Sequence, residues 1–201
     1  MSLLAGPAPG YDAQTFKDVT CQRETIRSKE FNACVFRHCS LRETIFIDCI
    51  FRECLFENSD LSLIQVKGCA FVNTSFHECQ LVGINWTELD WERGRLLKPF
   101  DFHKCVLSYS TFIGLKLKQI SLAECICKDV DFADADLTEA NCRGTDFADS
   151  RFLNTNLTQA DFTGARDYTI APNLNQLKQT KFSLPEAMAL LYGLDIILSE
   201  D

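Results

Sequence analysis

A five-residue period runs through most of this chain and limits what it can fold into. From Phe16 to Trp86 every fifth residue is apolar, and the pattern resumes one residue out of register from Phe102 to Phe162. A period of five fits neither the turn of about 3.6 residues of an α-helix nor the two-residue alternation of a strand. The chain must therefore turn a corner within each unit of five residues, with one large side chain pointing inward.

The residue two positions before each large one is a second candidate for the interior, because it is mostly small or carries a thiol. Like residues also recur every 20 positions; one such column is Phe16, Phe36, Phe56 and Phe76. This longer repeat predicts four units per coil, and therefore a square solenoid in which each coil contacts mainly its neighbours. The 28 units that follow the pattern predict about seven coils.

The units themselves resemble a known family. CLFEN at 54–58, ADLTE at 135–139 and ADFTG at 160–164 are similar to pentapeptide repeats. The resemblance implies an all-β solenoid, a right-handed quadrilateral β-helix, of about seven coils with a C-terminal helical dimerisation cap. We expect an N-terminal cap at 1–15, a first repeat run at 16–86, a junction at 87–101, a second repeat run at 102–166, and a C-terminal cap and dimerisation segment at 167–201.

The 11 cysteines all fall on the two inward positions, so packing in the core explains them. Cys21, Cys127 and Cys142 take the large position and the other eight take the small one. Disulfides or a metal site are the alternatives, since Cys34 and Cys54 lie in adjacent coils of the predicted solenoid. No CxxC pair occurs, however, and an odd number of thiols without a secretory signal favours a reducing, cytoplasmic setting. We therefore expect neither a metal nor a cofactor.

Charge and motif content argue against several classes of function. The formal net charge is −8, whereas binding to nucleic acid or to an anionic membrane needs clustered Lys and Arg. No apolar run approaches the roughly 18 residues of a membrane span. The histidines His38, His77 and His103 occupy outward positions, and no two of them align in the repeat. Without a phosphate-binding loop or a nucleophile elbow, the sequence predicts a protein that is not an enzyme.

Acidic residues concentrate between positions 129 and 149, where seven of them accompany a single base, Arg143. Acids directly before a large residue occupy a place where pentapeptide repeats commonly carry Asp or Asn, which bonds the backbone of the turn. Acids two positions after a large residue are free to face solvent, and they fall on successive faces. We name the six candidate partner contacts the acidic girdle: Asp129, Asp134, Asp136, Glu139, Asp146 and Asp149.

The break between the two runs is flanked by the only two tryptophans, Trp86 and Trp91. About ten residues are extra here. We expect a junction at which one part of the solenoid is offset onto the next, with large side chains filling the mismatch. The alternative is a protruding loop that touches a partner.

The C-terminal segment 167–201 leaves the repeat pattern. Ser183 and Glu186 have the spacing of a capping box, with Pro185 in the first turn and Gly193 as the expected stop. An open solenoid end must be covered, but this segment carries more apolar surface than a cap needs, which favours a two-fold dimer. The expected dimer contacts are Phe182, Leu184, Pro185, Met188, Leu191, Leu194 and Ile196.

Across nearly its whole length the chain resembles the topoisomerase-binding branch of the family. That branch includes the Qnr quinolone-resistance proteins, the mycobacterial fluoroquinolone-resistance protein and the albicidin-resistance protein, to which this chain is most similar. The resemblance rests on GINWT at 83–87 with Trp91, on the Cys- and Phe-rich first half, and on the ending that begins FSLPEA at 182–187.

This second resemblance implies a cytoplasmic dimer that mimics duplex DNA in size and charge. Such a protein binds DNA gyrase or topoisomerase IV and protects the enzyme from drugs or toxins, and here the acidic girdle would be the contact. Many Qnr proteins carry projecting loops that are important for protection, whereas both runs here are unbroken, so gyrase binding is implied more strongly than quinolone protection. A generic β-helical scaffold for another protein partner is the alternative.

Overall fold

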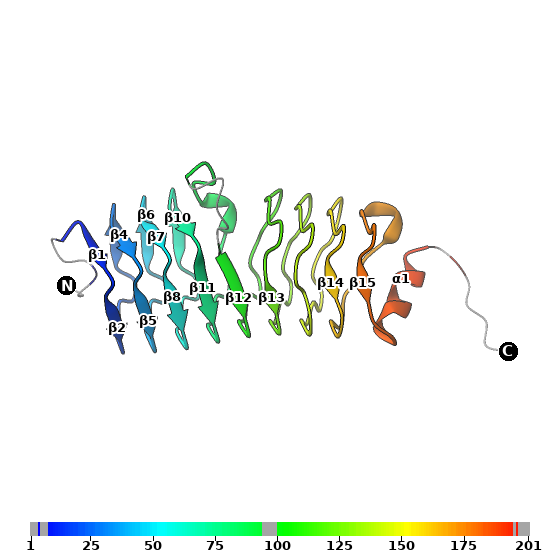
Figure 1. The fold of residues 1–201 in the computed structure, drawn as a ribbon, viewed down its shortest axis with the longest axis horizontal. Helices are drawn as coiled ribbons and strands as arrows, with labels where there is room; N and C mark the ends of the chain where they lie inside the picture. Colours follow the sequence, from blue (N-terminus) through cyan, green and yellow to red (C-terminus); the bar gives the residue numbers. More distant parts are fainter. Residues whose placement is uncertain (1–3, 5–7, 94–99, 195, 197–201) are drawn as a thin grey trace.

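The structure of the chain is a computed structural model that describes residues 4, 8–93, 100–194 and 196. It is an elongated parallel β-solenoid, with β1 (Gly10–Asp12) near one end and α1 (Ala189–Tyr192) at the other (Figure 1). Each coil has four short faces, which we number 1 to 4 in chain order, starting from the face centred on Phe16. The predicted all-β solenoid is confirmed, and its right-handed sense stays a prediction from the resemblance.

Equivalent strands of successive coils pair in parallel. Face 1 holds β2 (Thr15–Lys17), β5 (Val35–Arg37), β8 (Leu55–Glu57), β11 (Thr74–His77), β12 (Phe100–His103), β13 (Leu122–Ala123), β14 (Asp161–Phe162) and β15 (Lys181–Phe182). Face 2 is held by single bridges, beginning with the one between Thr20 and Ser40. Face 3 holds β3 (Thr25–Arg27), β6 (Ile45–Ile47) and β9 (Gln65–Lys67). Face 4 holds β1, β4 (Glu30–Asn32), β7 (Ile50–Arg52) and β10 (Ala70–Val72).

The solenoid has about eight turns, one more than expected, because its ladders extend beyond both ends of the counted repeat. At one end β1 pairs with β4, and the ring centroid of Tyr11 lies 5.4 Å from that of Phe31, within the range expected to be a cap. At the other end β14 pairs with β15. Tyr11 precedes Phe16 by five residues and Phe182 follows Phe162 by 20, so both fit the five-residue period. The sequence pattern therefore already includes these outer coils. Leu4 is fully buried in the core cluster.

Columns of stacked large side chains form the core, one column per face. On face 4 the ring centroids of Phe31, Phe51 and Phe71 are 4.8 Å apart at each step, and on face 1 those of Phe36 and Phe56 are 4.4 Å apart. The in-register parallel ladder imposes this spacing, because it places equivalent side chains directly above one another at about 4.8 Å per strand. Stacked rings at such distances add stability beyond the apolar area they bury.

The small inward position satisfies a backbone carbonyl of the preceding coil. The thiol of Cys54 donates to the carbonyl oxygen of Phe31 at 3.2 Å. Where the position is apolar, as at Ala140, the corresponding carbonyl of Leu117 accepts instead from the N–H of Ile120, within its own turn, at 3.2 Å. Buried carbonyls need a partner, so the thiol and hydroxyl side chains of both runs and the alanines of the second run represent two solutions to one requirement.

Nearly every corner between faces has a left-handed backbone. The non-glycine corners have φ between 47° and 62°, a region that is uncommon for residues other than glycine, asparagine and aspartate. None of the described residues with positive φ is Val, Ile or Thr, because branching at Cβ is least compatible with this conformation. Side chains at these corners point away from the core and are therefore available for contacts.

The break is an insertion into one face and does not offset two sub-solenoids. Hydrogen-bonded partners across it are 26 residues apart instead of 20, so six residues are extra. The ladders of faces 1, 2 and 3 continue through it, with Phe76 paired to Phe102 on face 1. Among the described residues, the ladder of face 4 alone is interrupted, between β10 and the bridge that joins Lys116 to Asp136. The expected offset junction is therefore wrong.

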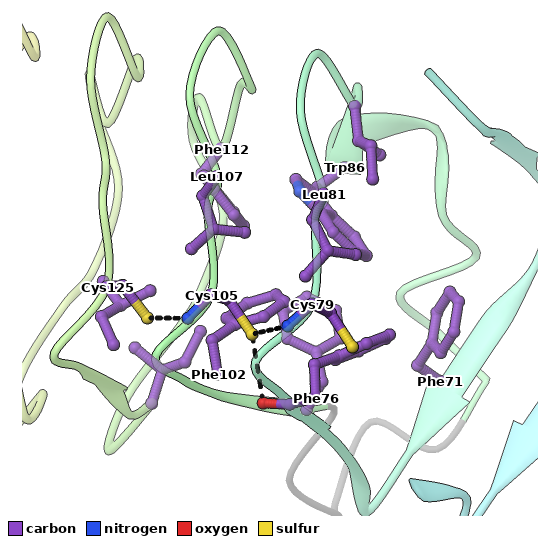
Figure 2. Close-up of a cluster of buried hydrophobic side chains, with 14 of the residues drawn as sticks. Phe71, Phe76, Cys79, Leu81, Trp86, Phe102, Cys105, Leu107, Phe112 and Cys125 are labelled. Carbon is purple, nitrogen blue, oxygen red and sulfur yellow. Dashed lines mark hydrogen bonds between the residues drawn. The ribbon is translucent and has the colours of Figure 1, made fainter. Parts of the chain in front are cut away.

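Large side chains fill the interior at the insertion, as predicted. Trp86, which begins the 3-10 helix η2 (Trp86–Glu88), is fully buried, and Figure 2 shows it among the phenylalanines of neighbouring coils. Its ring centroid lies 4.9 Å from that of Phe100 and 5.8 Å from that of Phe112. Outside the core, Arg93 lines a cavity of about 140 Å³ together with Val72 and other residues of face 4. The described start of the insertion thus lies against this face.

All 11 cysteines are buried and free, which confirms that they pack in the core. Cys79, Cys105 and Cys125, from three successive coils, lie in one row (Figure 2). The backbone N–H of Cys79 donates to Sγ of Cys105 at 3.5 Å, and the N–H of Cys105 donates to Sγ of Cys125 at 3.4 Å. The sulfur atoms are therefore part of the hydrogen-bonded interior.

Candidate partner-binding surface

The acidic girdle divides into two structural classes. Asp136 and Asp146 lie on faces, directly before a large residue, and are half-buried. The other four girdle residues are exposed and occupy corners with positive φ; we name them the corner acids, and they are Asp129, Asp134, Glu139 and Asp149. Asp129 and Asp149 share the edge between faces 2 and 3, while the other two lie on two further edges. The corner acids therefore lie on three of the four edges and do not form a single stripe, as the sequence indicated.

The two face acids hold turns together and carry compensated charge. Asp136 accepts a hydrogen bond from the backbone N–H of Thr138 at 3.1 Å, and Nζ of Lys118 lies 3.4 Å from its other carboxylate oxygen. Partial burial alone would raise the pKa of Asp136, but the bonds from Thr138 and the nearby Lys118 hold that pKa below its ordinary value. Asp146 likewise bonds the turn that follows it and pairs with Arg166 at 3.0 Å. The prediction that such acids bond the turn is confirmed.

The corner acids carry the free charge of the girdle. Within the described part of the chain, none of the four forms an ion pair. Asp134 accepts a hydrogen bond from the amide of Asn154 at 3.3 Å, and Glu139 accepts one from the amide of Gln119 at 2.7 Å. These amides are neutral, so they leave the carboxylate charges uncompensated. Four charges of the girdle, and not six, are therefore available to a partner.

The insertion pairs two histidines that the sequence pattern kept apart. Because it shifts the second run by six residues, His77 and His103 are in register on β11 and β12, with ring centroids 5.8 Å apart. The expectation that no two histidines align is therefore wrong. No group of three or more His, Cys, Asp or Glu side chains in the described residues could hold a metal ion.

Apolar side chains at the C-terminal end are exposed. Leu184 is 77% exposed, and Met188, Leu194 and Ile196 are about half exposed. Tyr192, which the sequence analysis did not select, is also 77% exposed. The sequence could have indicated this residue, because Tyr192 follows Met188 by four positions and therefore lies on the same side of a helix.

Other residues expected in the dimer contact have different surroundings. Phe182 lies in β15 with its ring centroid 5.4 Å from that of Phe162, so it belongs to the last coil. Leu191 is half-buried, whereas Pro185 is exposed. The apolar surface available for dimerisation is therefore smaller than expected. It consists of the exposed residues Leu184, Pro185, Met188, Tyr192, Leu194 and Ile196.

The helical segment at this end begins later than the capping-box spacing indicated. It consists of the 3-10 helix η4 (Glu186–Met188) followed by α1, and no side chain caps either helix. The hydroxyl of Ser183 instead accepts a hydrogen bond from the N–H of Gly164 at 2.9 Å, which ties the segment to the last coil. The expected capping box is therefore wrong, whereas Gly193 ends α1 as predicted. A further 3-10 helix, η3 (Pro172–Leu174), precedes this segment. Among the described residues, no helix has the length and apolar character to span a membrane.

Solved structures with a similar fold include several of QnrB1, described as a plasmid-mediated fluoroquinolone resistance protein. Two trypsin-treated variants of QnrB1 align with TM-scores of 0.69 and 0.66 at 16% identity, covering 96% and 92% of this chain and 98% and 100% of theirs. Full-length QnrB1 aligns with a TM-score of 0.52 at 18% identity, covering 93% of this chain and all of its own. At these identities the likeness concerns the fold alone.

Two family models match the sequence, and both describe the same repeat. A pentapeptide repeat region matches residues 29–99, and an array of eight pentapeptide repeats matches residues 125–164. No curated protein is similar enough in sequence to count as a relative. Together with the four-faced coils and the columns of inward side chains, these matches show that the chain belongs to the pentapeptide repeat proteins.

Proposed function

We propose that this protein is a cytoplasmic binding protein, and not an enzyme, whose partner is DNA gyrase or the related topoisomerase IV. In this proposal it acts as a homodimer joined through its C-terminal end and occupies the DNA-binding surface of the enzyme. It thereby modulates the enzyme's activity or protects it from a drug or toxin. The likeness in fold to QnrB1, a fluoroquinolone resistance protein, supports this proposal.

The observation that carries the proposal is the density of uncompensated charge at the corner acids. Asp129, Asp134 and Glu139 lie on three successive corners of a single turn. One turn rises about 4.8 Å, so these three carboxylates follow one another at roughly 1.6 Å of axis, against about 1.7 Å per charge in duplex DNA. The exposed Lys128 of the same turn lowers the net charge of this set from three to two. Over this turn the axial spacing of the exposed carboxylates therefore approaches that of the phosphates in the nucleic acid it is proposed to replace.

A supercoiling assay tests the proposal directly. Increasing amounts of the protein are added to purified gyrase, relaxed plasmid and ATP, with and without a gyrase poison. Inhibition of supercoiling, or rescue from the poison, is the expected result. If neither occurs while the protein remains folded, gyrase is not the partner, and a scaffold for another protein is the better description.

Neutralising the corner acids is expected to weaken gyrase binding and to flatten its dependence on salt. The quadruple variant carries Asp129→Asn, Asp134→Asn, Glu139→Gln and Asp149→Asn. Each removed charge lowers long-range attraction, which acts mainly on the association rate and is screened over about 10 Å at 0.1 M salt. Association is measured by surface plasmon resonance at several salt concentrations.

The matched control removes four exposed acids from the first half of the solenoid: Asp12→Asn, Asp18→Asn, Glu53→Gln and Glu78→Gln. It changes the net charge by the same amount, so it separates the location of the charge from its total. Equal association rates for the two variants at every salt concentration would contradict the assignment of the corner acids as the contact.

Introducing a charge into the exposed C-terminal surface is expected to convert a dimer into a monomer. Leu184→Asp places a carboxylate among apolar side chains that the dimer would bury, where an unpaired charge is strongly unfavourable. Since Leu184 is 77% exposed in the single chain, the solenoid itself should keep its stability. Molar mass by light scattering distinguishes the two states, with Ile113→Asp as a control on an exposed apolar residue of the solenoid. A wild-type chain that is already monomeric would contradict the dimer.

A further inference from the structure

One edge of the solenoid, between faces 2 and 3, differs from the other three. Five of its successive corners form a row that we name the Tyr109 edge, and they are Leu63, Gly83, Tyr109, Asp129 and Asp149. The corners of the two coils before Leu63 are Arg23 and Glu43, which pair with each other at 2.7 Å. Within the Tyr109 edge, the N–H of each of the first four residues donates to a carbonyl of the next coil at 2.8–2.9 Å. The row is therefore fixed by the backbone, with a rise of about 4.8 Å per coil and a length of roughly 19 Å.

The first part of the Tyr109 edge is apolar and contains a groove. Gly83 has no side chain, and a Cβ built there would lie 2.7 Å from Cδ2 of Leu63. Leu63, Ile64 and Ile45 line the groove beside Gly83, which has a volume of about 570 Å³. The rest of it is lined by Glu88, Gln65, Asn85 and the ion pair between Arg23 and Glu43. The groove is thus large enough for a side chain of a partner, with aliphatic residues beside Gly83 and polar or charged residues on the rest of its lining.

Tyr109 follows this groove on the same edge and makes no contribution to the core. Its side chain is 63% exposed, and within the described part of the chain it stacks on no other ring. Its φ of 62° places a bulky side chain in the left-handed region, which is uncommon for such residues. The other non-glycine corners share this conformation, so the fold imposes it on whichever residue stands there. The exposed ring of Tyr109 is not needed for the core, and it suits a contact with another molecule.

The second part of the edge carries Asp129 and Asp149, directly after Tyr109. These are the two corner acids that lack even an amide partner in the described structure. Two like charges one coil apart repel each other, so their position on one row favours a ligand of opposite charge over a role in folding. An aromatic side chain next to uncompensated carboxylates is complementary to a basic surface that also carries apolar groups.

In the coils that hold Tyr109, Asp129 and Asp149, the other three edges lack this combination. Between faces 1 and 2 the corners are Lys104, Glu124 and Gly144, and the first two pair at 3.9 Å. Between faces 3 and 4 they are Gly114, Asp134 and Asn154, and between faces 4 and 1 they are Gln119, Glu139 and Gln159. None of these nine corners is an exposed aliphatic or aromatic residue.

We propose that the Tyr109 edge is the main contact of this protein with its partner, and that it binds a basic protein segment with an apolar side chain seated beside Gly83. This inference rests on the proposed function, which supplies gyrase as the partner to be tested. Tyrosine is among the residues that dominate binding energy at protein interfaces, while the two aspartates orient the basic segment and speed its association.

The test compares the affinities of purified gyrase for matched variants of the full chain. Tyr109→Ala is expected to weaken binding about tenfold or more, as for a tyrosine at the centre of an interface. Ile126→Ala, at an exposed apolar residue of face 2, is the control and should leave affinity unchanged. The double variant Asp129→Asn with Asp149→Asn is compared with Asp134→Asn with Glu139→Gln, which removes the same number of charges from two of the other three edges.

The outcomes separate the two proposals. If the wild-type chain binds gyrase and only the Tyr109-edge variants lose affinity, both proposals are supported. If it binds and the two double variants lose affinity equally, or Tyr109→Ala binds as well as wild type, the Tyr109 edge is not the main contact while the proposed function stands. If the wild-type chain does not bind gyrase, both fail together. Circular dichroism of each variant verifies that the solenoid is intact.

Discussion

Replacing Phe51 with alanine is expected to lower the free energy of unfolding by about 3–5 kcal/mol. Phe51 is 2% exposed, and its ring centroid lies 4.8 Å from those of both Phe31 and Phe71 in the face 4 column. It also meets Phe46 edge-on at 5.5 Å. Because the backbone ladders fix the distance between coils, the neighbouring rings cannot close the gap that alanine leaves, and the full cost of the cavity is expected.

Urea unfolding measures this loss, followed both by circular dichroism and by tryptophan fluorescence. Two probes are needed because coils of a solenoid contact mainly their neighbours, so one half can unfold before the other. Phe51→Leu is the control; it keeps most of the volume and should cost less than about 1.5 kcal/mol. A loss below about 1 kcal/mol for Phe51→Ala would mean that the stack rearranges and is not held by the ladders.

The second large effect concerns the thiols, which are expected to react orders of magnitude more slowly in the native protein than in the unfolded chain. Burial raises the pKa of Cys54 to about 12, and it also raises the pKa of the fully buried Cys142. The thiolate is the reactive form, so at pH 8 the reactive fraction of Cys54 is on the order of 10⁻⁴. Labelling with a disulfide reagent should modify all 11 thiols in guanidinium and almost none without it. Fast labelling of any native thiol would contradict a closed core.

The same raised pKa values give the direction of the response to alkali. A thiol whose pKa is higher in the folded state holds its proton more tightly there, so its contribution to stability is complete below the unfolded pKa. That contribution is lost as the pH rises from about 9 towards the folded value of about 12 for Cys54. Thermal unfolding should therefore shift to lower temperature over this range. The variant Cys54→Ser keeps a donor to the carbonyl of Phe31 and should show a smaller shift.

The repeat pattern predicted the parts of the fold that depend only on local spacing. Large residues every five positions must stack once the coils have 20 residues, so the columns of Phe31, Phe51 and Phe71 follow from the sequence. The insertion could not be placed in this way, because the pattern shows that the register changes but not which face absorbs the extra residues. That choice depends on packing around Trp86 and Phe100, and it also determines that His77 meets His103.

The candidate surface was likewise predictable only where it depends on the local spacing of residues. The five-residue position of each acid distinguished corner acids such as Asp129 from turn-bonding acids such as Asp136. The ion pair between Asp146 and Arg166 was not predicted, because it joins side chains of different coils whose orientations depend on their surroundings. Tyr109 was overlooked although its signal was readable, since it is a large aromatic residue at a position that is polar or glycine in most units.

The left-handed corners separate what holds this protein together from what it presents. Since the core is built from inward positions alone, corner residues can be exchanged with little effect on folding, provided that they are not branched at Cβ. Each edge therefore presents corner residues at a fixed spacing of about 4.8 Å. Charged or aromatic side chains can be substituted at these positions one at a time. Adding a coil lengthens each edge and leaves the spacing between its corner residues unchanged. A lineage of such proteins can consequently change partners through substitutions on one edge while inheriting the scaffold unchanged.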